Sequence, residues 1–238
     1  MDYRSLMINS SAGITLASGT AAPIRHQGAG RLDLSAALAN LLSVEPTSVQ
    51  FGVGSGAVRF TRDIVVRNLS ATDSLDVTVR VAPFEGTIAP TLDTASLQLA
   101  GASQGTIRLS FSGDGAAGEH QGFVLLTNQK NEVVTRIPYW YGARSAEAKA
   151  ITVLGKPNQG KAGQAVVFGA RVVDGGGIDV DGADLKVAAM TPGAEVMEVG
   201  RLDGIPGVIG IAVRLVPGAN TFSLAAGGMQ RLLEIEGQ

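Results

Sequence analysis

Residues 58–67 read Val-Arg-Phe-Thr-Arg-Asp-Ile-Val-Val-Arg, and this stretch decides the fold class. Apolar side chains at positions 58, 60, 64 and 66 share one parity, whereas polar side chains at 59, 61, 63 and 67 share the other. Alternation with a period of two is typical of a β-strand that buries one face. Residues 75–81 and 107–112 repeat the pattern. The sequence therefore predicts a mainly β protein with half-buried strands.

Further strand candidates lie on both sides of these segments, separated by glycine, proline and asparagine. They are residues 48–51, 96–99, 122–127 and 133–141, and then 151–154, 165–173, 183–189, 195–202, 208–216, 220–225 and 229–235. Many short strands with turn residues between them are typical of β-sandwiches. We therefore predict two tandem β-sandwiches, over residues 44–144 and 151–238.

The other regions have a different composition. Residues 1–43 are rich in alanine, serine and glycine and contain two helix-like segments, Arg4–Asn9 and Leu34–Leu42. Asp33 or Ser35 is suited to cap the second segment, because their side-chain oxygens accept hydrogen bonds from first-turn amides. Residues 145–150, small and charged, are predicted to form a linker or a single helical turn.

Composition excludes several classes of function. The chain has 238 residues, 19 basic and 21 acidic, without a basic cluster, so no nucleic-acid partner is expected. No apolar run approaches the roughly 18 residues of a membrane-spanning helix. The absence of cysteine excludes disulfides, thiolate nucleophiles and cysteine-ligated zinc. With two histidines, the chain is poorly equipped for acid–base or metal chemistry.

Three stretches, in order, resemble the C-terminal part of the subtilisin-like serine proteases. They are Ser5-Leu6-Met7-Ile8-Asn9-Ser10-Ser11-Ala12, then Gln27-Gly28-Ala29-Gly30-Arg31-Leu32-Asp33 with Ala36-Ala37-Leu38, and then the region from Val58 through residues 118–124 to Arg136-Ile137-Pro138-Tyr139-Trp140. The first is similar to a late helix of that family's catalytic domain, and the second to the glycine turn and helix that end it. The third is similar to the fibronectin type III-like sandwich of many larger members. The resemblance implies that residues 1–43 are a remnant of a catalytic domain and that 44–144 are fibronectin type III-like.

The same resemblance implies that the catalytic residues lie elsewhere. The family uses an aspartate, a histidine, a serine and an asparagine, and its serine motif precedes the helix matched by residues 5–12. The segment Gly19-Thr20-Ala21-Ala22-Pro23 is similar to that motif, but alanine replaces the serine and the proline comes too early. We therefore expect this chain to be no enzyme. We assign no catalytic residue, no cofactor-binding residue and no metal ligand in it, and no cofactor.

Two loops invite a ligand interpretation. Asp174, Asp179, Asp181 and Asp184 lie in a glycine-rich segment, but the spacing lacks the glutamate of the helix–loop–helix calcium motif, so a solvated turn is favoured. The segment Gly52-Val53-Gly54-Ser55-Gly56 is similar to a phosphate-binding loop. A strand rather than a helix follows it, which favours a hairpin loop.

Histidines and aromatic residues leave alternatives open. His26 and His120 have no second histidine or acid placed near them in sequence, so structural or surface roles are favoured, although a pair across the fold is an alternative. Tyr139, Trp140 and Tyr141 form either a stacking platform for sugar or peptide, or a buried cluster with one exposed ring. Alternation favours the buried cluster.

These observations give two hypotheses of function. In the first, the chain is the non-catalytic C-terminal region of an exported subtilisin-like protease, with the parent catalytic domain and a protein or peptide substrate as partners. In the second, it is a cell-surface adhesion or binding protein of tandem Ig-like domains, with carbohydrate binding at the aromatic cluster as one form. Residues 163–172 are loosely similar to bacterial Ig-like repeats, which makes the second sandwich Ig-like. Both hypotheses place the protein outside the cell, with an export signal expected upstream, because residues 1–4 lack the features of a signal peptide.

Overall fold

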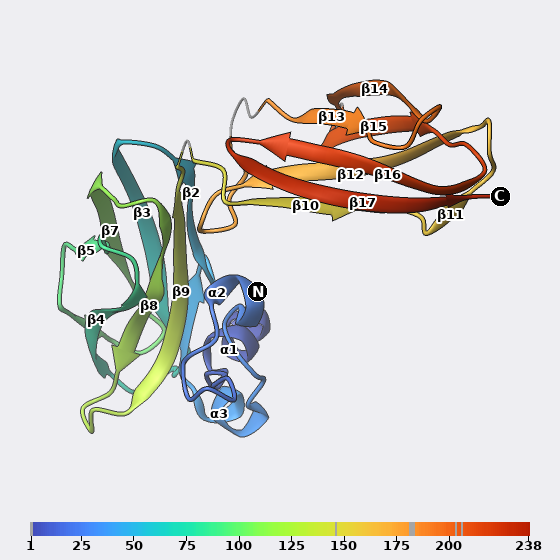
Figure 1. The fold of residues 1–238 in the computed structure, drawn as a ribbon. Coiled ribbons are helices and arrows are strands. Elements are labelled where there is room, and N and C mark those ends of the chain that lie inside the picture. Colours follow the sequence, from blue (N-terminus) through green and yellow to red (C-terminus); the bar gives the residue numbers. More distant parts are fainter. Residues whose placement is uncertain (1, 146, 181–183, 203, 206) are drawn as a thin grey trace. The chain divides into compact units, whose positions relative to one another are not determined.

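The chain is mainly β and divides into two compact units, Met1–Ala143 and Arg144–Gln238 (Figure 1). The computed structural model describes residues 2–145, 147–180, 184–202, 204–205 and 207–238. Each unit is a β-sandwich with a hydrophobic core of its own. The prediction of two tandem β-sandwiches is therefore confirmed.

The first unit begins with three short helices, α1 (Asp2–Asn9), α2 (Ile24–Gln27) and α3 (Leu34–Ala39). Its strands are β1 (Leu42–Glu45), β2 (Val49–Gly54), β3 (Ala57–Asn68), β4 (Leu75–Glu85), β5 (Thr91–Leu92), β6 (Ser96–Leu99), β7 (Gln104–Asp114), β8 (Gly118–Thr127) and β9 (Val133–Ala143). One sheet has the order β1-β3-β7-β5 and the other the order β2-β9-β8-β4-β6. Figure 1 shows the three helices along one side of this sandwich, next to β9.

The second unit contains two four-stranded sheets, with the orders β10-β12-β15-β14 and β11-β17-β16-β13. Its strands are β10 (Ala150–Leu154), β11 (Gln159–Gly160), β12 (Ala165–Val173), β13 (Lys186–Ala189), β14 (Glu195–Arg201), β15 (Ile209–Arg214), β16 (Gly218–Ala226) and β17 (Met229–Gly237). Phe222 and Leu224 of one sheet and Ile211 and Val213 of the other are fully buried between the sheets. They form the centre of the second core.

Both units have the same arrangement of strands. The order β1-β3-β7-β5 corresponds to β10-β12-β15-β14, and β2-β9-β8-β4 corresponds to β11-β17-β16-β13. In each unit a short early strand pairs in parallel with the last strand, as β2 with β9 and β11 with β17. A pair of sheets with this order is typical of Ig-like sandwiches.

Strand β8 departs from simple alternation, because it is buried from Glu119 to Thr127. Val124 and Leu126 face the main core of the sandwich. Phe123 and Leu125, on the opposite face, pack with Ile24 of α2. The N-terminal helices therefore cover the outer face of a sheet whose inner face already lies in the core.

The strands that the sequence predicts agree with the structure apart from their ends, but other predictions need correction. The helix predicted over Leu34–Leu42 ends at Ala39, because the backbone turns at Asn40 and Leu42 begins β1. Helix α2, strand β1 and the two-residue strands β5 and β11 were not predicted. The predicted linker 145–150 ends in a strand, since Ala150 pairs with Val173 in the second unit.

Candidate functional site

Several polar side chains in the N-terminal segment, residues 1–43, are buried, and three of them hold the segment against the first sandwich. Ser5, Asn9 and Asn40 are each less than a tenth exposed. Buried polar groups are costly unless they are hydrogen-bonded, so their partners show what holds the segment in place.

Asn9 lies at the end of α1 and donates from Nδ2 to two backbone carbonyls, those of Thr47 and Arg136, each at 2.8 Å. Its Oδ1 accepts from the Ser5 hydroxyl, which in turn accepts from the amide of Val44 in β1 at 2.7 Å. Helix α1 is therefore joined to both sheets of the sandwich.

Asn40, after α3, makes a second junction. Its Nδ2 donates to the carbonyl of Val134 at 2.8 Å and to the hydroxyls of Ser10 and Thr135 at 2.9 and 3.0 Å. Its Oδ1 accepts from the amide of Leu42 at 2.9 Å. Its side chain thus holds the start of β1 and attaches it to β9, while its backbone amide caps α3.

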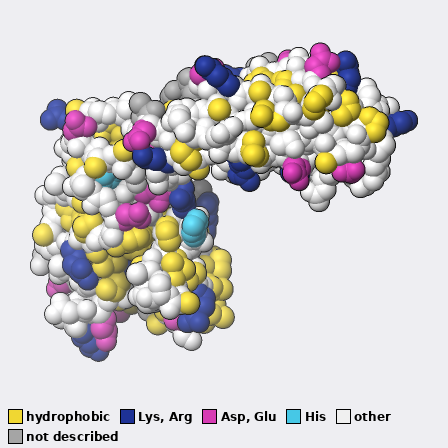
Figure 2. Space-filling model, viewed as in Figure 1, with side chains coloured by type: hydrophobic (Ala, Val, Ile, Leu, Met, Phe, Trp, Pro, Cys, Tyr) yellow, Lys and Arg dark blue, Asp and Glu magenta, His cyan; other side chains and the backbone are white. Residues whose placement is uncertain are grey.

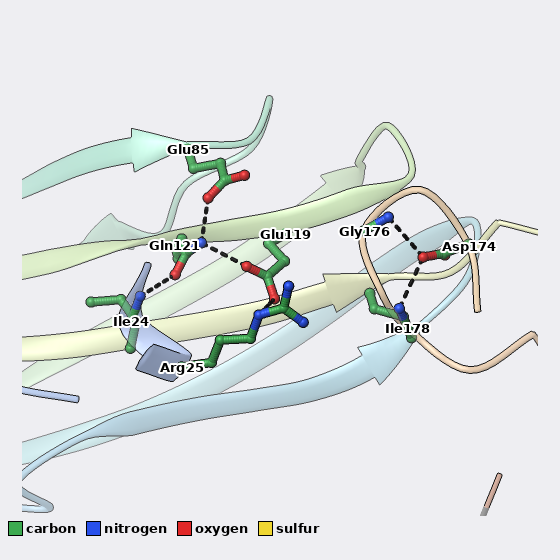
Figure 3. A network of polar contacts seen from close by, with 8 residues as sticks. All are labelled: Ile24, Arg25, Glu85, Glu119, Gln121, Asp174, Gly176 and Ile178. Atoms are coloured by element: carbon green, nitrogen blue, oxygen red, sulfur yellow. Dashed lines mark hydrogen bonds and ion pairs between the residues drawn. The ribbon is translucent and has the colours of Figure 1, made fainter. Parts of the chain in front are cut away.

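Helix α2 is held by a network of charged and polar groups on the outer face of β8 (Figure 3). Arg25 Nε lies 3.0 Å from the Glu119 carboxylate, which is almost fully buried. Gln121 accepts from the amide of Ile24 at 2.6 Å and donates to the carboxylates of Glu119 and Glu85. The network gives the buried Glu119 both a cation and an amide donor, which is the condition for keeping a charge inside a protein.

Apolar and cationic contacts strengthen this docking. The guanidinium of Arg136 lies 4.1 Å from the centre of the Phe123 ring and donates to the carbonyl of Ser11 at 3.3 Å. Burial lowers the pKa of Arg136 from its ordinary value. The N-terminal segment is therefore part of the packed structure of the first unit.

The outer side of the same segment is unusually apolar. Tyr3 and Met7 lie four residues apart on α1, and Leu34 and Leu38 four residues apart on α3, so that each pair shares a helix face. Tyr3 is 82% exposed and Leu38 80% exposed. Ile14, Leu16, Leu32 and Leu41 of the same segment are exposed as well.

We call these eight residues the apolar face of the N-terminal segment. Helices α1 and α3 contact each other, and Figure 2 shows apolar side chains gathered over the part of the first unit where the helices lie. Single exposed leucines are common on protein surfaces, but a group of this size in one short segment is typical of an interaction surface.

The described structure places each of the residues that the sequence analysis considered for catalysis. In the segment Gly19–Pro23, Thr20 and the alanines precede α2, where Pro23 is the N-cap. His26 is exposed at the end of α2. His120 is buried: its Nδ1 accepts from the amides of Thr87 and Ile88, and its Nε2 lies 2.9 Å from the carbonyl of Ala116. Both ring nitrogens of His120 thus hold backbone groups, one in the loop after β4 and the other in the loop between β7 and β8.

The three aromatic residues of β9 do not form one platform. Tyr139 and Tyr141 are buried in the core, and burial raises the pKa of both hydroxyls, with Asp114 adding to the effect at Tyr141. Trp140 lies on the opposite face with Ile24, Phe123 and Leu125. The favoured interpretation, with buried rings and one partly exposed ring, agrees with this placement.

The prediction of a solvated turn is wrong for Asp174, which is buried. Asp174 is buried and accepts from the amides of Gly176 and Ile178 at 2.9 and 3.0 Å through Oδ1, and from Ser145 at 2.9 Å through Oδ2 (Figure 3). Asp179 lies 3.8 Å from Arg171, and Asp184 lies 4.0 Å from Lys186. Asp181 falls outside the described residues. Among the described side chains, no group of three or more histidines, aspartates or glutamates is arranged to hold a metal ion.

The glycine loop at 52–56 is not a hairpin loop, and this prediction was wrong. Strands β2 and β3 belong to different sheets, because β2 pairs in parallel with β9. The loop therefore carries the chain from one sheet to the other.

Comparisons with known proteins give little beyond the fold. No protein-family model and no curated protein matches the chain. Among solved structures, a PapD-like domain of human CEP192 is 14% identical at a TM-score of 0.36, and covers 45% of this chain and 88% of its own. The Escherichia coli chaperone DraB is 12% identical at a TM-score of 0.35, with 83% of this chain and 98% of its own covered.

The Yersinia pseudotuberculosis adhesin InvE is 14% identical at a TM-score of 0.33, with 82% of this chain and 57% of its own covered. Similarity at this level gives no indication of function. No helix in the described part of the chain combines the length and apolarity needed to cross a membrane.

Proposed function

We propose that the chain is a non-catalytic accessory region of an exported protein, and that its first unit packs against another protein domain through the apolar face of the N-terminal segment. The observation that carries the proposal is that the N-terminal segment has two sides with different surroundings. Its inner side is fixed to the sandwich by buried hydrogen bonds, whereas its outer side exposes Tyr3, Leu34 and Leu38 by more than half of their surface.

The partner that fits this surface best is the catalytic domain of a subtilisin-like protease, preceding this chain in the same polypeptide. The resemblance of residues 5–12 and 27–38 to the last helices of that domain supports this identification. Helices that belong to a larger domain would normally be packed on both sides, and α1 and α3 are packed on one.

In this arrangement the accessory region acts by holding the neighbouring domain in a fixed orientation. Because Asn9 and Asn40 attach α1 and α3 directly to the strands of the first sandwich, a domain resting on those helices would be held in a fixed orientation to that sandwich. The region would then stabilise the catalytic domain and fix the direction from which substrate approaches it.

Two experiments test the proposal. The reading frame upstream of residue 1 is expected to encode the aspartate, histidine and serine motifs of the family, and their absence would refute the protease assignment. The chain alone is expected to leave casein intact, and hydrolysis blocked by a serine-directed inhibitor would show that it contains a nucleophile of its own.

The apolar face is tested separately. The upstream polypeptide, expressed together with this chain, is expected to co-purify with it. Replacing Leu34 and Leu38 by serine is expected to abolish co-purification, whereas the matched control Leu232→Ser, which alters an exposed leucine of the second unit, is expected to leave it unchanged. If the unsubstituted chain, the Leu34→Ser/Leu38→Ser variant and the Leu232→Ser variant all co-purified equally with the upstream polypeptide, the apolar face would be excluded as the contact.

A second candidate is a cell-surface binding or adhesion protein of tandem Ig-like domains. The observation that favours it is the second unit, which has its own core, the same strand order as the first and none of the protease-like motifs. The upstream sequence separates the two candidates, because an adhesion protein would have further Ig-like domains there in place of the catalytic motifs.

A further inference from the structure

The first unit contains a pocket of about 460 Å³ beside the apolar face. It is lined by α1, α2, the segment leading into β2, and β9. This volume lies within the usual range for small-ligand sites. Asn9 and Asn40 are not among its lining residues, although Asn9 donates to the carbonyl of Thr47 at the pocket wall.

The lining of the pocket combines apolar residues with basic residues and contains no acidic residue. Ile8, Ile24, Pro138 and the Trp140 side chain give an apolar surface, whereas Arg4 and Arg25 supply positive charge. Thr47, Ser48 and Gln50 add neutral polar groups, and no aspartate or glutamate is among the lining residues. The pocket thus offers hydrogen-bond donors and cations next to apolar walls.

The two arginines differ in availability. Arg25 is neutralised by Glu119 at 3.0 Å. Arg4 is exposed, and its guanidinium forms no ion pair with any side chain in the part of the structure described. Trp140 contributes an aromatic ring to the lining.

We propose that this pocket binds the C-terminal end of a peptide whose last side chain is apolar. The terminal carboxylate accepts charge-assisted hydrogen bonds from Arg4, and the apolar side chain packs against Ile8, Ile24 and Trp140. The peptide backbone lies along β2, which is an edge strand and pairs only with β9 among the described strands.

A neutral sugar fits this lining less well. Sugars present several hydroxyl donors that need acceptors, and carboxylate acceptors are absent from the lining residues. The aliphatic walls formed by Ile8, Ile24 and Pro138 match an aliphatic or aromatic side chain better than a ring of hydroxyls.

The site is distinct from the apolar face. Arg4 and Ile8 each follow one residue after Tyr3 and Met7, which places them about 100° further round α1. A partner resting on Tyr3 and Met7 therefore leaves the pocket side of the helix open, and the proposal does not depend on which domain covers the apolar face.

The experiment uses the full chain and the fluorescence of Trp140, which is its only tryptophan. N-acetyl-Gly-Gly-Leu with a free carboxylate is titrated in parallel with the same peptide as its C-terminal amide, and with glucuronate as an acidic sugar. Saturable fluorescence change is expected with the free acid. Binding is expected to be at least about tenfold weaker for the amide, since a hydrogen-bonded charge is lost.

Two variants complete the test. Arg4→Gln is expected to weaken binding of the free acid about tenfold or more, whereas Arg62→Gln on β3, an exposed arginine outside the pocket, is expected to leave it unchanged. Absence of saturable change, equal binding of acid and amide, or binding of glucuronate in place of the peptide would each overturn the proposal.

Discussion

Asn9 Nδ2 donates to the carbonyl oxygen of Arg136 at 2.8 Å, across 127 residues of chain. The same amide nitrogen donates to the carbonyl of Thr47, also at 2.8 Å. Asn9 is fully buried, so its amide nitrogen depends on these carbonyls as hydrogen-bond acceptors. A single side chain therefore joins the first helix of the unit to its last strand.

Asn9→Ala is expected to lower the free energy of unfolding of the first unit by about 1–2 kcal/mol, because two partly buried carbonyls lose a donor. Urea unfolding followed by Trp140 fluorescence measures this unit alone, since the second unit has no tryptophan. The control is Gln98→Ala, which removes an exposed amide from β6 and should change stability by less than about 0.5 kcal/mol. Equal effects of the two substitutions would show that Asn9 is not a structural junction.

Tyr139→Phe is expected to leave stability unchanged or to raise it slightly, because the Tyr139 hydroxyl is buried and has no hydrogen-bond partner among the described residues. Tyr139→Ala, in contrast, removes a fully buried ring and is expected to cost about 3–5 kcal/mol. Both are measured by urea unfolding. A loss above about 1 kcal/mol in the phenylalanine variant would reveal a partner for the hydroxyl.

The ion pair of Asp63 and Arg108 predicts a pH dependence. These residues are register partners on β3 and β7, with Arg108 Nε 2.8 Å from Asp63 Oδ1, and this hydrogen bond lowers the pKa of Asp63 below its ordinary value of 3.8. The contribution of the pair is therefore present above about pH 4 and is lost as the pH falls through the folded-state pKa.

Asp63→Asn is accordingly expected to lower the melting temperature of the first unit slightly at pH 7, and to match the unsubstituted protein once the pH is low enough to protonate Asp63 in both states. The pair is exposed, so the effect is small. A difference that grows on acidification would contradict the assignment.

Gly30→Ala is expected to destabilise the first unit by more than about 1 kcal/mol. Gly30 has φ of 126°, and a Cβ there would overlap the carbonyl of Ala12, which accepts from the Arg31 amide. Gly19→Ala is the matched control, because Gly19 also has a positive φ of 83° but faces open space. Thermal unfolding should show the larger loss for Gly30→Ala, and the reverse order would rule out the close approach to Ala12.

Strand positions were predictable because the alternation of buried and exposed residues along a strand is visible within a few consecutive residues of the sequence. Ile107, Leu109 and Phe111 alternate with polar residues on β7, and all three are fully buried. The same alternation placed Tyr139 and Tyr141 inside the core and Trp140 on the other face.

The covering of the outer face by residues 1–43 was less predictable. The uninterrupted apolar run Phe123-Val124-Leu125-Leu126 was the available signal, because a strand buried on both faces loses its alternation. Helix α2 is too short to give a periodic pattern, and its position depends on Gln121 and Glu119, almost a hundred residues later. The pocket behind Trp140 arises from four separate segments, which no local pattern could bring together.

The burial of β8 on both faces also determines where the first unit can be cut when it is expressed as a fragment or fused to another protein. A fragment that begins at residue 44 would lose Leu42 and Ser43 of β1 and would leave Phe123 and Leu125 without the cover of α2, so it would be prone to aggregation. The second unit does not need a covering segment of this kind, because its two sheets enclose their own core. When this region is fused to another protein, residues 1–43 must be included together with the first sandwich. The second sandwich can be fused separately, beginning at Arg144.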